Sequence, residues 1–361
     1  MIDIELQPLF KVFSDHSDSL HSVIVCPDGQ SYQYGNSSLH PPLVFYIKDF
    51  KLLSSFKKNS LSGLKEAYLK GHWECNHISK ILRLIDKTLT SCEQRVLKKF
   101  HHSPLHHSSL SKLSHDYNLF NSLPLEFFSA WLDPSLSHTI ASFHSNKMDP
   151  LYIAQQKSIQ HMLSILEHHH IHTVLDTHAM WGAFSEKASI HHDITLTTLS
   201  QTQAKFCKSR FHSIAYPINY QITTSPLEPG SYLPFDAAVG ILPPLVTTKD
   251  WSQYFYFLSK LVRPNGIVIA QLVFDSHFQP LRLKSILKKY NFSILENIHI
   301  SQNASKTHLA WLNNLSTQYQ RLEHLGFSPL FLRQWLYYFS EMAFYFDIDR
   351  LKARQMTLIK Y

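Results

Sequence analysis

The chain has 361 residues, of which 44% are hydrophobic and 13% aromatic, so it is long enough for two or three packed units and too apolar for a disordered protein. The formal net charge of +7 and the 25 histidines favour anionic partners, and the absence of a zinc finger, an RNP motif or a basic-helix pattern argues against nucleic acid. Because no apolar run approaches the roughly 20 residues that span a bilayer and the N-terminus does not resemble a signal peptide, we expect a cytoplasmic protein.

Residues 1–95 are predicted to form a small α+β module. Short β-like runs occur at residues 22–25 and 43–47, and turn signals rich in Gly, Asn and Asp lie between them. Near the end of the module, Ile78, Ile81 and Ile85 recur at the spacing of one buried helix face. The segment that follows, residues 96–116, is dominated by serine and histidine and is predicted to be a solvated linker.

Helix-like and strand-like segments alternate in residues 117–361. A helix is predicted over residues 155–166, and strands are predicted at residues 173–176, 194–196, 235–240 and 266–270. This alternation predicts an α/β fold with a doubly wound, mostly parallel sheet. Ligands of such sheets bind at the carboxyl ends of the strands, so Asp176 and the residues after it are the first candidates for a site. The tail up to Phe346 is predicted to be helical and rich in aromatic residues.

Several motifs occur in one order along the chain. They are Pro27-Asp28-Gly29, Tyr34-Gly35, the segment from Gly63 to Trp73, Phe127-Phe128, Trp131-Leu132-Asp133-Pro134, Thr198-Leu199-Ser200 with Gln203, Lys306-Thr307 with Trp311, and Arg333, Trp335 and Tyr338. As an ordered series they resemble the cyclopropane-fatty-acyl-phospholipid synthase family. The resemblance implies a lipid-binding-type module at residues 1–95. It also implies a Rossmann-like class I methyltransferase domain at residues 117–361, with a helical lid formed by residues 117–150 and 305–346.

The resemblance also implies a reaction. In this family a methyl group moves from S-adenosylmethionine to a lipid double bond, and a proton is then removed, with bicarbonate as the base. The cofactor would lie against a glycine-rich turn after the first strand of the methyltransferase domain. The positions of this chain that match cofactor-binding segments of the family are Asp176, Trp181, Gly182, Thr198, Leu199 and Gln203.

The glycine-rich turn departs from the family pattern. Where the family has Asp-Ile-Gly-Cys-Gly-Trp-Gly-Gly, this chain has Asp-Thr-His-Ala-Met-Trp-Gly-Ala, so that His178, Met180 and Ala183 replace glycines. Side chains therefore stand where bare backbone should approach the cofactor. We expect S-adenosylmethionine to bind weakly at best.

The family positions for acid–base chemistry have also changed. They fall on Ile140, Pro243, Pro244, Gln271 and Ala304, and the acidic residue expected near the adenine falls on Ser225. The side chains of isoleucine, proline and alanine neither donate nor accept a proton. The sequence therefore predicts no catalytic residue at these positions and indicates a catalytically impaired homologue.

Three residue groups have alternative interpretations. His170 and His172 have the two-residue spacing of metal ligands on a strand, but a polar loop is the simpler explanation and we predict no metal. Asp176 could orient the cofactor turn or cap the next helix, and Ser200 could contact cofactor or serve as the N-cap of its helix.

The sequence is compatible with two functions. The first is a pseudoenzyme that binds lipid or a partner protein, with a homodimer or a heteromer with an active synthase as the assembly. The second is an active, divergent methyltransferase acting on unsaturated phospholipid acyl chains. Six lysines between residues 48 and 70 predict a peripheral position on the anionic phospholipid of the inner membrane face: Lys48, Lys51, Lys57, Lys58, Lys65 and Lys70.

Overall fold

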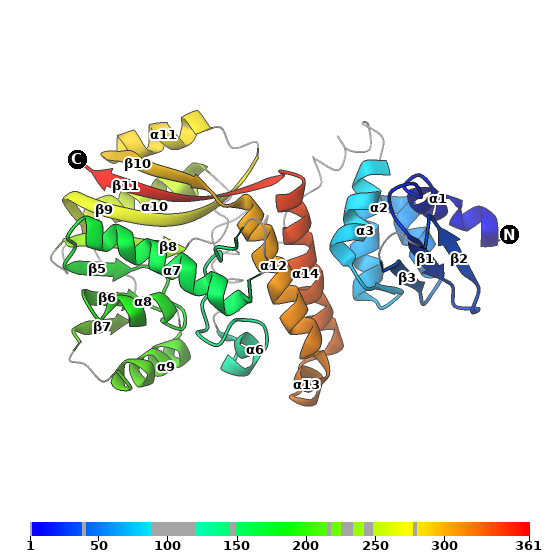
Figure 1. Ribbon diagram of the computed structural model, residues 1–361, viewed down its shortest axis with the longest axis horizontal. Helices are drawn as coiled ribbons and strands as arrows, with labels where there is room; N and C mark the ends of the chain where they lie inside the picture. Colours follow the sequence, from blue (N-terminus) through cyan, green and yellow to red (C-terminus); the bar gives the residue numbers. More distant parts are fainter. Residues whose placement is uncertain are drawn as a thin grey trace. The chain divides into compact units, whose positions relative to one another are not determined.

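The structure is a computed structural model, and it describes residues 2–37, 41–88, 120, 122–144, 149–198, 200–214, 218–224, 234–241, 248–276 and 280–361. The chain divides into two compact units (Figure 1). The first unit contains Met1–His102 and Leu315–Ile348, and the second contains Ser103–Asn314 and Asp349–Tyr361. The predicted linker, residues 96–116, lies outside the described residues, so the domain boundaries on either side of it stay predictions.

The first unit is built around a four-stranded sheet of order β2-β1-β3-β4, in which β1 and β3 are parallel. Its chain order is α1 (Ile2–Ser14), β1 (Ser22–Val25), β2 (Ser31–Tyr34), β3 (Leu43–Ile47), α2 (Lys51–Leu69), β4 (Trp73–Cys75) and α3 (Ile78–Thr88). Aromatic rings fill its core, where Phe45 stacks on Trp73 at 4.9 Å between ring centroids. The indole Nε1 of Trp73 donates to the Leu64 carbonyl at 2.8 Å, which joins α2 to this core.

Two helices from the far end of the sequence also belong to the first unit: α13 (Tyr319–His324) and α14 (Pro329–Asp347). The Arg333 guanidinium on α14 donates to the carbonyls of Tyr68, at 2.7 Å, and Trp73, at 2.9 Å. Lys65 on α2 forms an ion pair of 2.9 Å with Glu341, which is buried on α14. The contacts thus divide the predicted lid range 305–346, because residues from Leu315 onward pack with the first unit.

The second unit contains a seven-stranded sheet of order β10-β11-β9-β8-β5-β6-β7. Its elements are α6 (Leu125–Ser129), α7 (Leu151–His168), β5 (Thr173–Asp176), α8 (Ala183–Ala188), β6 (Asp193–Thr197), α9 (Gln201–His212), β7 (Tyr220–Thr223), β8 (Phe235–Ile241), α10 (Thr248–Leu261), β9 (Val262–Asp275), α11 (Pro280–Lys289), β10 (Phe292–His299), α12 (Ser301–Thr317, whose last residues enter the first unit) and β11 (Leu351–Lys360). Strands β7, β6, β5, β8 and β9 pair in parallel, and within this sheet β11 runs antiparallel to both of its neighbours, β10 and β9. The predicted doubly wound, mostly parallel sheet is confirmed.

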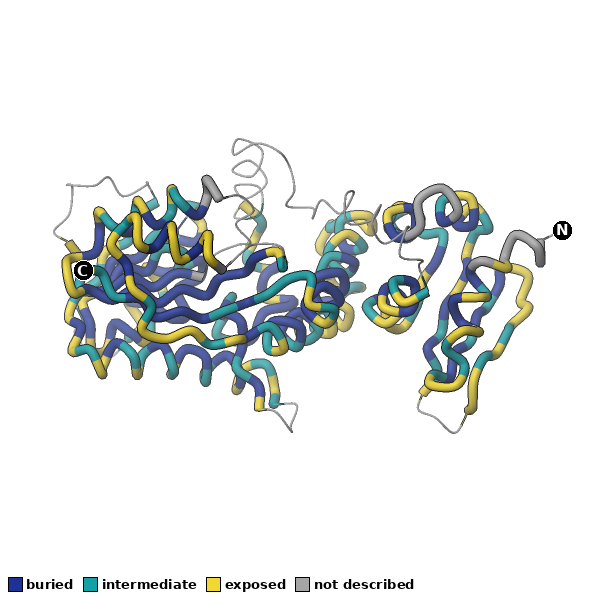
Figure 2. The backbone as a smooth tube through the Cα atoms, turned by 90° about the horizontal axis from the view of Figure 1, so that it is seen from above, coloured by how far each residue is buried: buried dark blue, intermediate teal, exposed yellow. Residues whose placement is uncertain are grey.

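Helices cover both faces of this sheet, and its central strands are buried along their length (Figure 2). Alternate strand residues point to opposite faces: Val174 joins a core with α7, α8 and α9, whereas Leu175 joins a core with α10 and α11. β5 pairs with β6 on one side and β8 on the other, so the strand order reverses there. In such sheets this reversal places a ligand site at the carboxyl end of β5, where Asp176 lies.

The strands and helices predicted from the sequence agree with these elements. Strands β1, β3 and β5 have the predicted bounds, and the predicted runs at 194–196, 235–240 and 266–270 lie within β6, β8 and β9. A search of the described residues finds no helix long and apolar enough to cross a membrane.

Candidate functional site

The turn after β5 is organised by Asp176, which is buried at the end of the strand. Its carboxylate accepts hydrogen bonds from the Ser185 hydroxyl at 2.6 Å and from the His178 backbone N–H at 3.2 Å. Burial raises the pKa of Asp176 to about 6. The N-cap of the following helix, α8, is Gly182, so Asp176 holds the turn and the first helical turn through Ser185 rather than capping the helix.

Met180 occupies the turn with a backbone conformation that glycine would favour. Its φ is +46°, in the left-handed region, and Gly182 two residues later has a φ of +79°. A left-handed conformation costs a non-glycine residue on the order of 1 kcal/mol. The side chain of Met180 is nevertheless buried, and its burial offsets that cost. The turn has therefore kept the backbone path of a glycine turn, although two side chains, His178 and Met180, now project from it.

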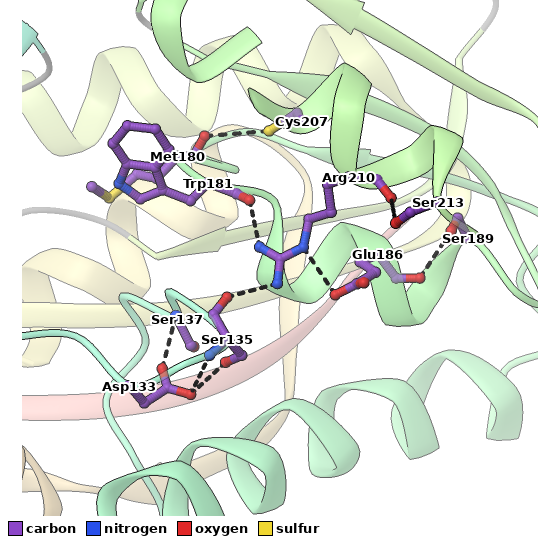
Figure 3. A network of polar contacts seen from close by, with 10 residues as sticks. All are labelled: Asp133, Ser135, Ser137, Met180, Trp181, Glu186, Ser189, Cys207, Arg210 and Ser213. Atoms are coloured by element: carbon purple, nitrogen blue, oxygen red, sulfur yellow. Dashed lines mark hydrogen bonds and ion pairs between the residues drawn. The ribbon is translucent and has the colours of Figure 1, made fainter. Parts of the chain in front are cut away.

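Arg210 of α9 fixes the outer side of this turn (Figure 3). Its Nη1 donates to the Trp181 carbonyl at 2.7 Å, its Nη2 donates to the Ser135 carbonyl at 2.8 Å, and its Nε pairs with Glu186 of α8 at 2.9 Å. Ser135 in turn donates through its backbone N–H and its hydroxyl to Asp133. One guanidinium thus joins the turn, α8 and the loop after α6.

The second predicted cofactor segment follows β6. Thr198 is buried, and its backbone N–H donates to the Thr223 carbonyl at 3.0 Å. The Ser200 hydroxyl accepts from the Gln203 N–H at 3.1 Å, so Ser200 is the N-cap of α9. Gln203 is fully buried, and Leu199 lies outside the described residues. This segment therefore forms a regular strand-to-helix junction.

Two of the five predicted acid–base positions, Ile140 and Gln271, meet in a buried amide network. The Gln271 side chain on β9 accepts from the Ile140 N–H at 2.8 Å and donates to the Ile140 carbonyl at 3.3 Å. The same Gln271 Nε2 lies 3.2 Å from both the Ser158 hydroxyl and Gln355 Oε1. Ser158 donates to the Ile140 carbonyl at 2.8 Å. Two of the five predicted positions are thus bonded to each other, and neither contributes a side chain that titrates.

The other acid–base positions contribute no functional group in the described residues. Ala304 is fully buried on α12, where its carbonyl lies 2.7 Å from the His308 Nδ1. Pro243, Pro244 and Ser225 lie outside the described residues.

Two histidines lie in an aromatic cluster beside this network. The His138 ring is stacked on Trp311, with centroids 5.2 Å apart and planes at 3°, and the His308 ring meets Trp311 edge-on at 5.0 Å. Burial lowers the pKa of both His138 and His308 to about 4, and burial lowers the pKa of His178 to the same level. All three imidazoles are therefore neutral at pH 7, a state in which each ring can accept one hydrogen bond and donate one.

Sequence patterns did not reveal Arg210 or the partners of Gln271. Arg210 binds mainly backbone carbonyls, and Gln271 bonds to residues more than eighty positions away. The polar loop predicted at His170 and His172 does precede β5, with His170 at a φ of +50°. A search of the described residues finds no group of three His, Cys, Asp or Glu that could hold a metal ion.

Similar proteins of known sequence cover nearly the whole chain. The tuberculostearic acid methyltransferase UfaA1 of Mycobacterium tuberculosis is 23% identical, with 90% of this chain and 85% of the relative aligned. The cyclopropane-fatty-acyl-phospholipid synthase of Escherichia coli K12 is 22% identical, with 91% and 93% aligned.

Solved structures show the same fold. The cyclopropane synthase MmaA2 of Mycobacterium tuberculosis matches with a TM-score of 0.58 at 18% identity, over 66% of this chain and 95% of its own. Mycolic acid cyclopropane synthase CmaA1, solved with SAH and CTAB, matches with a TM-score of 0.58 at 17% identity, over 68% and 98%. The predicted class I methyltransferase fold is thereby confirmed. Since the sequence profile of the mycolic acid cyclopropane synthetase family matches residues 106–290, just over half of the 361 residues, the chain belongs to that family.

Proposed function

We propose that this protein is a catalytically impaired cyclopropane synthase homologue that serves membrane lipid modification by binding rather than by methyl transfer. The observation that supports this most strongly is the amide network of Gln271 and Ile140. Ring closure needs a base that removes a proton from the methylated lipid. An amide side chain is neither acidic nor basic near neutral pH, so the groups at these positions hold backbone together instead.

The burial of the network adds to this argument. Gln271 is 2% exposed, and its oxygen and nitrogen are both engaged by protein groups. A small anion such as bicarbonate would have to displace these bonds, and each buried polar group left unpaired costs about 1–3 kcal/mol. The network therefore favours a site without a bound base.

S-adenosylmethionine is the cofactor that the family implies, and the turn after β5 does not fit it in the family pose. A glycine at each of positions 178 and 180 would leave backbone open to the cofactor. Here the Met180 side chain is buried against its surroundings, and the His178 Nδ1 lies 3.1 Å from the Thr177 hydroxyl. These side chains support the proposal that the cofactor binds weakly at best.

An active, divergent methyltransferase for unsaturated phospholipid acyl chains is the second candidate. The observation in its favour is the backbone of the turn, since Met180 and Gly182 keep positive φ values of +46° and +79°. A relative named as a tuberculostearic acid methyltransferase also supports this candidate, because its name describes a methyl transfer. A methyl transfer of that kind would still require the cofactor to pass the two side chains in the turn.

The proposed partners are an anionic membrane at the inner face and a second protomer, either of this chain or of an active synthase. Four of the six lysines on which the membrane proposal first rested have a carboxylate within 4 Å, and the side chains of Lys57 and Lys58 lie outside the described part of the structure. Lys48 pairs with Glu74, Lys51 with Asp49, Lys65 with Glu341 and Lys70 with Glu66. Such surface pairs weaken a local attraction to anionic lipid, so another surface must contribute to it.

The proposed function is tested by a lipid assay. The protein is incubated with S-adenosylmethionine and vesicles of unsaturated phosphatidylglycerol, and the acyl chains are measured by mass spectrometry. We expect no acyl chain that is heavier by one methylene. The Escherichia coli relative, assayed in parallel as the positive control, should produce such acyl chains. A product above the no-protein control would contradict the proposal and support the divergent methyltransferase.

A further inference from the structure

A group of unpaired cations lies on one side of the second unit. We call it the α11 surface, and it consists of Arg282, Lys284, Lys288 and Lys289 on α11 and Lys260 on α10. All five residues are exposed, and α11 packs beside α10 and β10 (Figure 1). Residues 280–291 contain four cations and no Asp or Glu, so the outer side of α11 is uniformly positive.

The four cations of α11 share one side of the helix because its other side is buried. Leu283, Ile286 and Leu287 face the core with α10. At about 100° per residue, Lys284 and Lys288 fall on one side of Leu281, and Lys289 and Arg282 fall on the other. Leu281 is 75% exposed, so an apolar side chain stands in the middle of four positive charges.

Two tyrosines extend the surface toward α10. The Lys260 Nζ lies 5.5 Å from the centre of the Tyr256 ring, and the Lys289 Nζ lies 5.2 Å from that of Tyr290. The two rings meet edge-on at 5.9 Å, and the Tyr290 hydroxyl lies 2.7 Å from that of Ser252. Tyrosine at the level of the headgroups and lysine reaching for phosphate are typical of a surface that rests on a bilayer.

The cations of the α11 surface differ from the lysines of the first unit because they have no carboxylate partner among the described residues. The ion pairs of the described residues include none of its five cations, whereas Lys48, Lys51, Lys65 and Lys70 each have a carboxylate within 4 Å. An unpaired cation near an anionic membrane contributes on the order of 1 kcal/mol of binding free energy.

We propose that the α11 surface is the site at which this protein binds an anionic phospholipid bilayer, with Leu281 entering the headgroup layer. The exposed leucine favours lipid over nucleic acid, because a phosphate backbone offers an apolar side chain no partner. This inference rests on the proposed association with membrane lipid. It does not depend on whether the cofactor binds, so the lipid product assay and the binding assay below can fail separately.

The test is co-sedimentation of the full chain with phosphatidylglycerol vesicles and with phosphatidylcholine vesicles at low and at physiological salt. The test variant carries Lys288→Gln and Lys289→Gln, and the matched control carries Lys48→Gln and Lys51→Gln. We expect the wild type to bind only the anionic vesicles, and less at higher salt. Removing two unpaired charges should weaken this binding about 30-fold, and the control change should weaken it only a few-fold.

A second variant, Leu281→Ser, separates lipid from nucleic acid. It should weaken binding to the anionic vesicles several-fold and leave binding to a DNA duplex unchanged. The inference is overturned if the Lys288 and Lys289 variant binds vesicles as the wild type does, if the wild type binds neither vesicle, or if it binds the duplex more tightly than the anionic vesicles. Since the changed side chains are exposed, circular dichroism should show the same fold in every variant.

Discussion

At the scale of single residues, the site has kept its backbone and exchanged its side chains. Met180 retains a left-handed turn, and Asp176 still bonds to the turn and to α8. Gln271 stands at one of the five predicted acid–base positions, and it uses both ends of its amide to hold Ile140. The side chain at this position therefore stabilises the fold through its hydrogen bonds.

The structural role of Gln271 can be measured. Replacing it by methionine, which is similar in size, leaves the buried Ile140 N–H without its acceptor. We expect the free energy of unfolding of the second unit to fall by about 2–3 kcal/mol. Urea denaturation measures this, with Gln201→Met as the control, since Gln201 is exposed and its side chain donates to Thr224 on the surface. Equal stability of the two variants would contradict a structural role for Gln271.

Because of its buried histidines, the protein should lose folding stability in acid. Burial lowers the pKa of His308 to about 4 in the folded protein, whereas an unfolded histidine titrates near 6.5. Between these values the unfolded state binds the proton and the folded state does not. Stability is therefore complete above about pH 6.5 and falls as the pH decreases toward 4.

A matched pair of histidines tests this dependence. His308 and His212 each place Nδ1 at 2.7 Å from the carbonyl four residues earlier, but only His308 is buried. The change His308→Gln should reduce the stability lost between pH 7 and pH 5 by about 1–2 kcal/mol, and His212→Gln should leave it unchanged. Urea denaturation at both pH values measures the difference, and an undiminished loss in His308→Gln would refute the assignment.

At the scale of elements, α14 is an integral part of the first unit. Arg333 binds two carbonyls of the α2–β4 region, pairs with Glu74 at 3.2 Å and lies 4.1 Å from the centre of the Tyr68 ring. Lysine has one charged nitrogen and cannot reproduce this planar set of contacts.

The anchoring of α14 by Arg333 can be followed by hydrogen exchange. Arg333→Lys should speed amide exchange in α14 and α2 by roughly 10- to 100-fold, because about 1.5–3 kcal/mol of charge-assisted bonding is lost. Arg321→Lys is the control, since Arg321 is exposed on α13 and donates to Gln318. Similar exchange in the two variants would show that other contacts hold the helix.

The parts that sequence could predict were those set by local periodicity. Strand β5 and its neighbours could be predicted because short apolar runs bounded by turn residues leave few alternatives. The packing of α14 on the first unit could not be predicted, because Arg333 binds residues some 260 positions earlier in the chain. The Gln271 network could not be predicted either, since a glutamine that bonds to backbone leaves no pattern in the sequence.

At the scale of the whole molecule, the protein has the family fold, and we propose that it has lost the family's chemistry. The seven-stranded sheet retains the ligand-binding edge of a methyltransferase at the end of β5. At the turn and in the network, the positions predicted to match the family's functional residues hold His178, Met180 and Gln271. A surface of unpaired cations on α11 remains available for lipid. Together these features support our proposal that the protein keeps the scaffold of a lipid-modifying enzyme and works through binding.

Isothermal titration calorimetry with S-adenosylmethionine tests this account most directly. The full chain is titrated under the same conditions as the Escherichia coli relative, which serves as the positive control. Because His178 and Met180 occupy the turn where the cofactor's backbone contacts would form, we predict no saturable heat below about 1 mM cofactor, a limit that corresponds to a binding free energy of about −4 kcal/mol. A dissociation constant in the micromolar range would contradict the account and make the divergent methyltransferase the better explanation of this chain.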